Sequence, residues 1–174
     1  SDLGGDMLEI GPGPGYVGLE IAKKLTPDSL TGCEISPAML QFARKNAKNY
    51  GIDARYVQGN CMEMPFEDES FDSVISNGSL HEWETPVRVF NEIYRVLRPG
   101  GRYCITDLRR NVNLLARYLG LATAKPRAIR PGFISSLNAA YTVGEITELL
   151  RNSDLKGAMV TTDFFGLCIS GEKK

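Results

Sequence analysis

Three glycines alternate with two prolines directly after a short apolar run, and carboxylates lie before and after them. The run at 7–10 contains Glu9 and ends at the loop 11–15, whose sequence is Gly-Pro-Gly-Pro-Gly. Glycine has no Cβ, so such a loop turns tightly and its backbone can approach a ligand, while the helix after it offers unpaired N–H groups. The sequence therefore predicts a ligand site that includes Gly11, Gly13 and Gly15.

Two classes of ligand fit this loop. Residues 13–18 satisfy the dinucleotide pattern G-x-G-x-x-G, and Glu34 follows as an acid, which together predict a nicotinamide cofactor. The other pattern begins with Glu9 and continues as Gly-x-Gly-x-Gly. A carboxylate at that place repels a pyrophosphate and attracts an ammonium or a sulfonium. Glu9 therefore favours a ligand with a positively charged group.

His81 is the only histidine in the chain and follows an expected strand at 71–76. Its ordinary pKa of about 6.5 suits a general base, which makes it the candidate catalytic residue. The alternative is a histidine that orients a loop. A metal site built from several histidines is excluded, and no C-x-x-C pair occurs, so we expect no metal site.

Short apolar runs alternate with amphipathic stretches along the chain. We expect strands at 7–10, 30–35, 54–58, 71–76 and 101–107, helices at 16–25, 37–50, 85–97 and 143–152, and a terminal hairpin at 159–170. The second helix should bury Met39, Leu40, Phe42, Ala43 and Ala47. This alternation predicts parallel βαβ units, in which ligands bind outside the carboxyl ends of the strands.

The composition is that of a globular protein. The chain has 174 residues, of which 43% are hydrophobic and 24% charged, and its formal net charge is −1. This balance argues against a dedicated nucleic-acid surface. No apolar run approaches the roughly 20 residues of a membrane-spanning helix. The first residues lack the pattern of a signal peptide and the cysteines are scattered, so we expect a cytoplasmic protein.

Five motifs occur in the order and spacing of one family. They lie at 9–15, 34–40, 59–66, 71–77 and 95–101. Together they resemble the class I S-adenosylmethionine-dependent methyltransferases, in particular the small-molecule group called methyltransferase type 11, from residue 7 to about 107. The resemblance implies a Rossmann-like, doubly wound α/β fold. Its seven-stranded sheet would be mainly parallel, with an antiparallel terminal strand.

The same resemblance implies one domain over residues 1–174. It would comprise a core at 7–107, a variable acceptor or lid segment at 108–141, and a C-terminal helix and hairpin at 142–174. Family members usually carry an upstream helical segment that folds over the cofactor, and this chain begins almost directly at its first strand. We therefore expect a more open cofactor site, a partner subunit that covers it, such as that of a homodimer, or a segment beyond this sequence.

The resemblance further implies S-adenosylmethionine as the cofactor. Glu34 would accept both ribose hydroxyls, Asn60 or the Cys61 amide would contact the adenine edge, and Asn77 and Gly78 would lie beside the methionine moiety. Many relatives have Asp where this chain has Asn60, so a neutral amide would here replace a charged acceptor. The expected cofactor residues are Glu9, Gly11, Gly13, Gly15, Tyr16, Glu34, Ile35, Met39, Asn60, Cys61, Met62, Asn77 and Gly78.

The implied activity is methyl transfer to a small-molecule acceptor by direct in-line displacement. The alternatives are a nicotinamide-dependent oxidoreductase and a non-catalytic domain that binds S-adenosylmethionine. The segment 107–141 is rich in arginine and lysine, which suits an acidic or phosphorylated acceptor or a solvated basic face. Alternatively, its leucines, with Phe133, would suit an apolar pocket.

Overall fold

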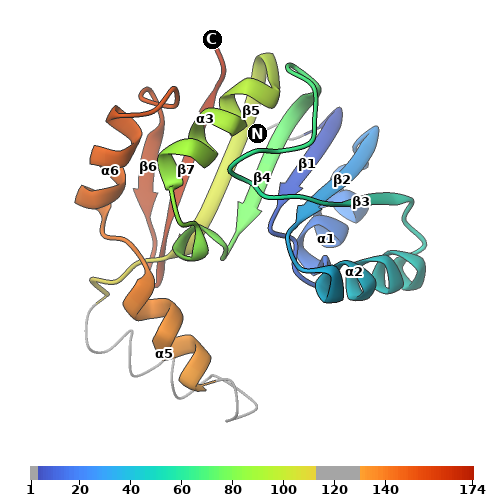
Figure 1. Ribbon diagram of the computed structural model, residues 1–174, viewed down its shortest axis with the longest axis horizontal. Helices are drawn as coiled ribbons and strands as arrows, with labels where there is room; N and C mark the ends of the chain where they lie inside the picture. The colour runs from blue at the N-terminus through green and yellow to red at the C-terminus, as the bar shows by residue number, and fades with distance from the viewer. Residues whose placement is uncertain (1–3, 113–129) are drawn as a thin grey trace.

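A seven-stranded sheet forms the centre of the computed structural model, which describes residues 4–112 and 130–174 (Figure 1). The strands are β1 (Asp6–Ile10), β2 (Ser29–Glu34), β3 (Ala54–Gln58), β4 (Phe71–Asn77), β5 (Leu97–Leu108), β6 (Met159–Thr162) and β7 (Gly166–Glu172). The helices are α1 (Tyr16–Leu25), α2 (Pro37–Tyr50), the 3₁₀ turn η1 (Leu80–Glu82), α3 (Pro86–Val96), α5 (Arg130–Ala139) and α6 (Val143–Arg151).

The strand order is β3-β2-β1-β4-β5-β7-β6. The strands β1 to β5 pair in parallel, and β7 runs antiparallel to both β5 and β6. The expected mainly parallel sheet with an antiparallel terminal strand is therefore confirmed. After β3 the chain returns to the other side of β1, so the loops after β1 and β4 leave the sheet side by side.

Both faces of the sheet are covered by apolar side chains. Along β1, Met7 packs in a cluster with residues of α1 and α2, whereas Leu8 packs in a second cluster with residues of α3 and α6. Burial on both faces is typical of parallel sheets, whose strands have nearly continuous runs of apolar residues. The sheet is thereby held rigidly enough to fix the positions of the loops at its carboxyl edge.

Local sequence explains where the helices begin. Ser36 caps α2, since its hydroxyl accepts a hydrogen bond from the Met39 N–H, and Pro37 occupies the first turn, as expected. At α6, Thr142 and Glu145 form a reciprocal capping box.

Three expectations about the elements need correction. Phe42 is 55% exposed, because it lies two residues, and so about 200° around the helix, from the buried Leu40. The strand β5 begins at Leu97, where the pattern had placed the end of the preceding helix. A helix, α5, occupies part of the segment that the sequence pattern left irregular. Residues 113–129 of the expected acceptor or lid segment lie outside the described residues.

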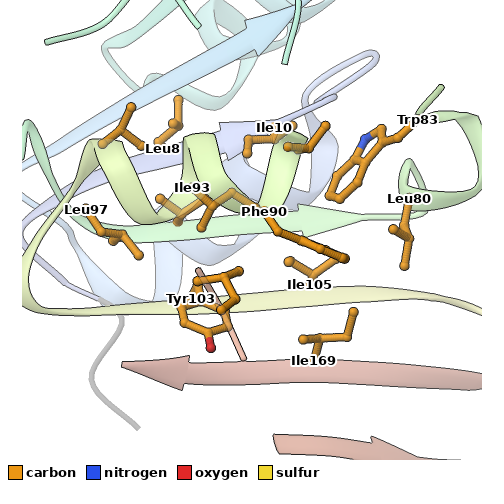
Figure 2. Packing of buried hydrophobic residues seen from close by; sticks show 14 of the residues in the cluster. Leu8, Ile10, Leu80, Trp83, Phe90, Ile93, Leu97, Tyr103, Ile105 and Ile169 are labelled. Carbon is orange, nitrogen blue, oxygen red and sulfur yellow. The ribbon is translucent and has the colours of Figure 1, made fainter. Parts of the chain in front are cut away.

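The larger core cluster surrounds α3. Figure 2 shows Phe90 and Ile93 of α3 directed toward the sheet, close to Ile105 of β5, and Trp83 beside Phe90. The Trp83 and Phe90 rings are 5.9 Å apart in an edge-to-face arrangement. No helix within residues 4–112 and 130–174 has both the length and the apolar composition needed to cross a membrane.

We expect Phe90→Ala to lower the free energy of unfolding by about 3–5 kcal/mol, because it empties a fully buried site. Urea unfolding followed by circular dichroism measures this change. The matched control is Phe42→Ala, which removes the same ring from an exposed site and should change the free energy by about 0.5 kcal/mol or less. Equal losses in the two variants would contradict the assignment of the core.

Candidate functional site

The glycine loop follows β1 as expected, and its backbone requires glycine. Gly11, Gly13 and Gly15 all have positive φ, at 62°, 51° and 83°. At Gly11 a Cβ would also lie 2.8 Å from the Ser79 side chain, because the loop after β4 packs directly against the loop after β1. The loop thus takes a conformation and a close contact that other residues would disturb.

Glu9 lies behind this loop. Its carboxylate is 2% exposed and accepts a hydrogen bond of 3.0 Å from the Gly18 N–H in the first turn of α1. A Cβ at Gly18 would overlap the carboxylate. The other oxygen of Glu9 has no partner among the described residues, and burial raises the pKa of Glu9 to about 7. Glu9 therefore anchors the helix that follows the loop.

Glu34 ties the end of β2 to the same loop. One of its oxygens accepts a hydrogen bond of 3.0 Å from the Gly13 N–H, and the other accepts one of 2.9 Å from the Ser36 N–H. A carboxylate has about four lone-pair sites, so further donors can still bind to it. Glu34 both orders the loop and keeps acceptor capacity for a ligand's hydroxyl groups.

A cavity of about 710 Å³ opens beside the glycine loop, and we call it the loop cavity. All the expected cofactor residues line it except Glu9 and Gly15. Several lining residues from the segment after β4 are not among those predicted from the sequence. They are Ser79, Glu82, Trp83 and Glu84. Their position after a strand of the sheet was the available clue, since residues there face the ligand edge.

The turn after β3 forms one wall of the loop cavity. The Asn60 side chain accepts a hydrogen bond of 2.9 Å from the Met62 N–H, which leaves its amide N–H groups for another partner. Burial raises the pKa of the Cys61 thiol to about 11, so this side chain is neutral at pH 7. The wall offers neutral polar groups, which suit an uncharged base better than a phosphate.

The charged residues of the loop cavity have one sign. Its lining contains three carboxylates, those of Glu34, Glu82 and Glu84, and no lysine or arginine within the described residues. Like charges repel and opposite charges attract most strongly where water is partly excluded. The cavity is therefore suited to a ligand with positive charge and poorly suited to a pyrophosphate.

His81 borders a second cavity, of about 440 Å³, between the ends of β4 and β5, α5 and the turn from β6 to β7. We call it the hairpin cavity. Asn77 and Gly78 line both cavities. The Asn77 side-chain oxygen accepts a hydrogen bond of 2.7 Å from the Thr106 hydroxyl, which fixes its orientation. Two ligands in the two cavities would thus meet at the end of β4.

Asp107 holds the imidazole of His81. The His81 Nδ1 lies 2.9 and 3.0 Å from the two oxygens of Asp107, and the His81 backbone N–H donates to the same carboxylate. The Leu108 N–H is a further donor to it, at 2.6 Å. The hydrogen bond to Asp107 raises the pKa of His81 above its ordinary value. No local motif links these two residues, which come together because β4 and β5 are neighbours.

The pH dependence of the free energy of unfolding tests whether burial raises the pKa of Glu9. Its folded-state pKa of about 7 exceeds the ordinary 4.5, so its contribution to stability is complete below about pH 4.5 and is lost as the pH rises through about 7. Glu9→Gln keeps an acceptor for the Gly18 N–H and cannot ionise. We expect the variant to gain about 2–3 kcal/mol over the wild type between about pH 5 and about pH 8.5.

Urea unfolding of both proteins at the two pH values measures this gain. The other titrating groups are the same in both proteins, so the difference between their free energies of unfolding reports on Glu9 alone. Parallel stability curves would show that Glu9 titrates near its ordinary pKa.

The sequence model of a family described as "Methyltransferase domain" matches residues 8–105. A phthiotriol/phenolphthiotriol dimycocerosates methyltransferase of Mycobacterium tuberculosis is 35% identical over 129 residues. The alignment covers 74% of this chain and 47% of that protein, so the chain spans about half the length of this relative.

Solved structures share the fold. A protein of Methanococcus maripaludis, described as a candidate S-adenosyl-L-methionine-dependent methyltransferase, has a TM-score of 0.78 at 25% identity, with 98% of this chain and 78% of that chain covered. A plantazolicin methyltransferase in complex with a triazolic desmethylPZN analogue and SAH has a TM-score of 0.77 at 17% identity, and the match covers 98% and 76% of the two chains.

The family match spans more than half of the chain and includes the glycine loop and the ends of β2 and β4. The strand order and the antiparallel β7 agree with it. The chain therefore belongs to the methyltransferase domain family, within the class I S-adenosylmethionine-dependent methyltransferases.

Proposed function

We propose that this chain binds S-adenosylmethionine in the loop cavity and transfers its methyl group to a small-molecule acceptor in the hairpin cavity. The observation that carries the proposal is the lining of the loop cavity, which has three carboxylates and no lysine or arginine among the described residues. S-adenosylmethionine has both an ammonium and a sulfonium, whereas a nicotinamide dinucleotide has a pyrophosphate. The charge of the cavity favours the former.

The residues present fit this molecule. Glu34 keeps lone pairs for the ribose hydroxyls, and the neutral turn at Asn60 and Cys61 suits the adenine. Met39 and Ile35 supply apolar contact beside Glu34. When bound, the molecule supplies a methyl group that is already activated by its attachment to a sulfonium.

The chain's own contribution is largely alignment. Asn77 and Gly78 border both cavities, so an acceptor in the hairpin cavity lies next to the contents of the loop cavity. Holding two reactants in line is worth roughly 7–11 kcal/mol of the barrier. His81, held by Asp107 at the wall of the hairpin cavity, is the group proposed to take a proton from the acceptor.

We expect Glu34→Ala to weaken binding of S-adenosylhomocysteine by roughly 1–3 kcal/mol, because charge-assisted hydrogen bonds to the ribose are lost and Gly13 is no longer held. Isothermal titration calorimetry measures the change, with circular dichroism to confirm folding. The control Glu148→Ala removes an exposed carboxylate of α6 and should leave the affinity unchanged. Unchanged affinity in Glu34→Ala would remove Glu34 from the site.

A thermal-shift comparison separates the classes of cofactor. We expect S-adenosylhomocysteine to raise the melting temperature, because a ligand that binds only the folded state stabilises it, and we expect NAD to have no effect. Stabilisation by NAD alone would favour an oxidoreductase. Binding of S-adenosylhomocysteine without transfer of a labelled methyl group to any acceptor in a broad screen would favour a non-catalytic binding domain.

A further inference from the structure

Polar and apolar side chains both line the hairpin cavity. The polar ones include Asn77, which the loop cavity shares, and those of Thr106, His81, Ser136 and Asp163. The apolar ones come from three elements and include Leu108 of β5, Phe133 of α5, and Phe165 and Leu167 of the hairpin. Apolar walls with a few convergent polar groups are typical of sites for small organic ligands, and two phenylalanines suit a flat ring.

The described lining of the hairpin cavity contains no lysine or arginine that could pair with an acidic acceptor. Arginines nevertheless lie nearby in the sequence. Arg110 pairs with Glu145 and donates to the Ala140 carbonyl, and Arg109 donates to the Asp163 carbonyl. The Asp163 carboxylate accepts hydrogen bonds from the hairpin backbone. Among the described residues that line the cavity, a phosphate or carboxylate on the acceptor would therefore find no lysine or arginine as its counter-charge.

Asp107 fixes the tautomer of His81. The Asp107 side chain is 1% exposed and already accepts hydrogen bonds from two backbone N–H groups, those of His81 and Leu108. An ionised carboxylate only accepts hydrogen bonds, so Nδ1 of His81 must carry the proton that faces it. The neutral ring then has its lone pair on Nε2, which makes no hydrogen bond within residues 4–112 and 130–174. Nε2 is the nitrogen that remains to act as a base.

We propose that the hairpin cavity takes an apolar, ring-bearing acceptor with a weakly acidic hydroxyl, as in phenols, and that Asp107 is the positioning residue that keeps Nε2 of His81 free to take its proton. This inference rests on the proposed function. The acceptor O–H bond breaks and its proton passes to Nε2. The oxygen bonds to the methyl carbon while the carbon–sulfur bond breaks, and that electron pair stays on sulfur. The products are a methyl ether, S-adenosylhomocysteine and an imidazolium that later releases its proton to water.

The charges around His81 come from three elements. Asp107 of β5 makes the direct contact, Glu82 of η1 is adjacent in the chain, and Asp163 of the hairpin borders the same cavity. Asp107 and Glu82 raise the pKa of His81, while burial lowers it. The base works only when it is unprotonated, so the rate should rise with pH through a pKa above the ordinary value of about 6.5. Loss of the Asp107 charge should lower that pKa.

The first experiment reads the tautomer directly. His81 is the only histidine, so protein labelled with ¹⁵N-histidine gives the two nitrogen signals of a single imidazole in long-range ¹H–¹⁵N spectra. We expect a neutral ring protonated at Nδ1, and a pKa of His81 that is lower in Asp107→Asn than in the wild type, because the hydrogen bond to a charged carboxylate is lost. The control Asp68→Asn removes an exposed carboxylate and should change neither property. A ring protonated at Nε2, or an unchanged pKa in Asp107→Asn, would overturn the role of Asp107.

The second experiment tests the acceptor class with 2-naphthol, 2-naphthoate and 2-naphthyl phosphate. Calorimetry first establishes that S-adenosylhomocysteine binds, since failure at this step refutes the proposed function as well. In the saturated protein, we expect 2-naphthol to shift the His81 signal and the two anions to leave it unchanged. Tighter binding of either anion, or no shift with 2-naphthol, would overturn the acceptor class while leaving cofactor binding intact.

Kinetics with 2-naphthol and S-adenosylmethionine separate the base from a structural role. We expect His81→Gln to lower kcat by a factor of about 10² or more, with little change in KM and in the affinity for S-adenosylhomocysteine. This variant keeps a polar side chain at the site and does not depend on whether Asp107→Asn folds. Equal kcat values in His81→Gln and the wild type would reduce His81 to a structural residue.

Discussion

Two buried carboxylates from adjacent parallel strands hold the glycine loop in its conformation. Glu34 accepts a hydrogen bond from Gly13 within the loop, and Glu9 accepts one from Gly18 in the helix that follows. Glycine-rich backbone loses much conformational entropy on ordering, and the hydrogen bonds that the two carboxyl groups accept offset part of that loss. The loop is therefore ordered before a ligand arrives, and less of the binding free energy is spent on ordering it.

The strand order determines where that loop can act. The segments after β1 and β4 leave neighbouring strands, and Gly11 and Ser79 make the contact between them. A crevice opens at this point of a doubly wound sheet because successive crossovers leave it in opposite directions. The end of β4 also borders the hairpin cavity, so Asn77 and Gly78 lie between two spaces that the same sheet edge defines.

Local patterns predicted the parts of the site that depend on neighbouring residues. The glycine spacing, the Ser36 cap and the acid ending β2 were all found as expected. The direction of the Glu9 side chain could not be predicted from the sequence. Because β1 is buried on both faces, its sequence lacks the alternation of apolar and polar residues that shows which side chains face the core. The contact of His81 with Asp107 was also hidden, since it joins residues 26 positions apart through the pairing of β4 and β5.

The charges of the two cavities constrain how the proposed reaction can be accelerated. Carboxylates in the loop cavity stabilise a cation before it reacts, and methyl transfer removes positive charge from sulfur, so these groups stabilise the reactant more than the transition state. In the proposed reaction they favour binding of the cation and release of a product that has lost the sulfonium charge. Acceleration of the proposed reaction must then arise where the acceptor binds, by alignment at Asn77 and Gly78 and by the base that we propose at His81. The proposed base meets that requirement. A buried carboxylate holds it on the acceptor side, where it is separate from the carboxylates proposed to bind the cation.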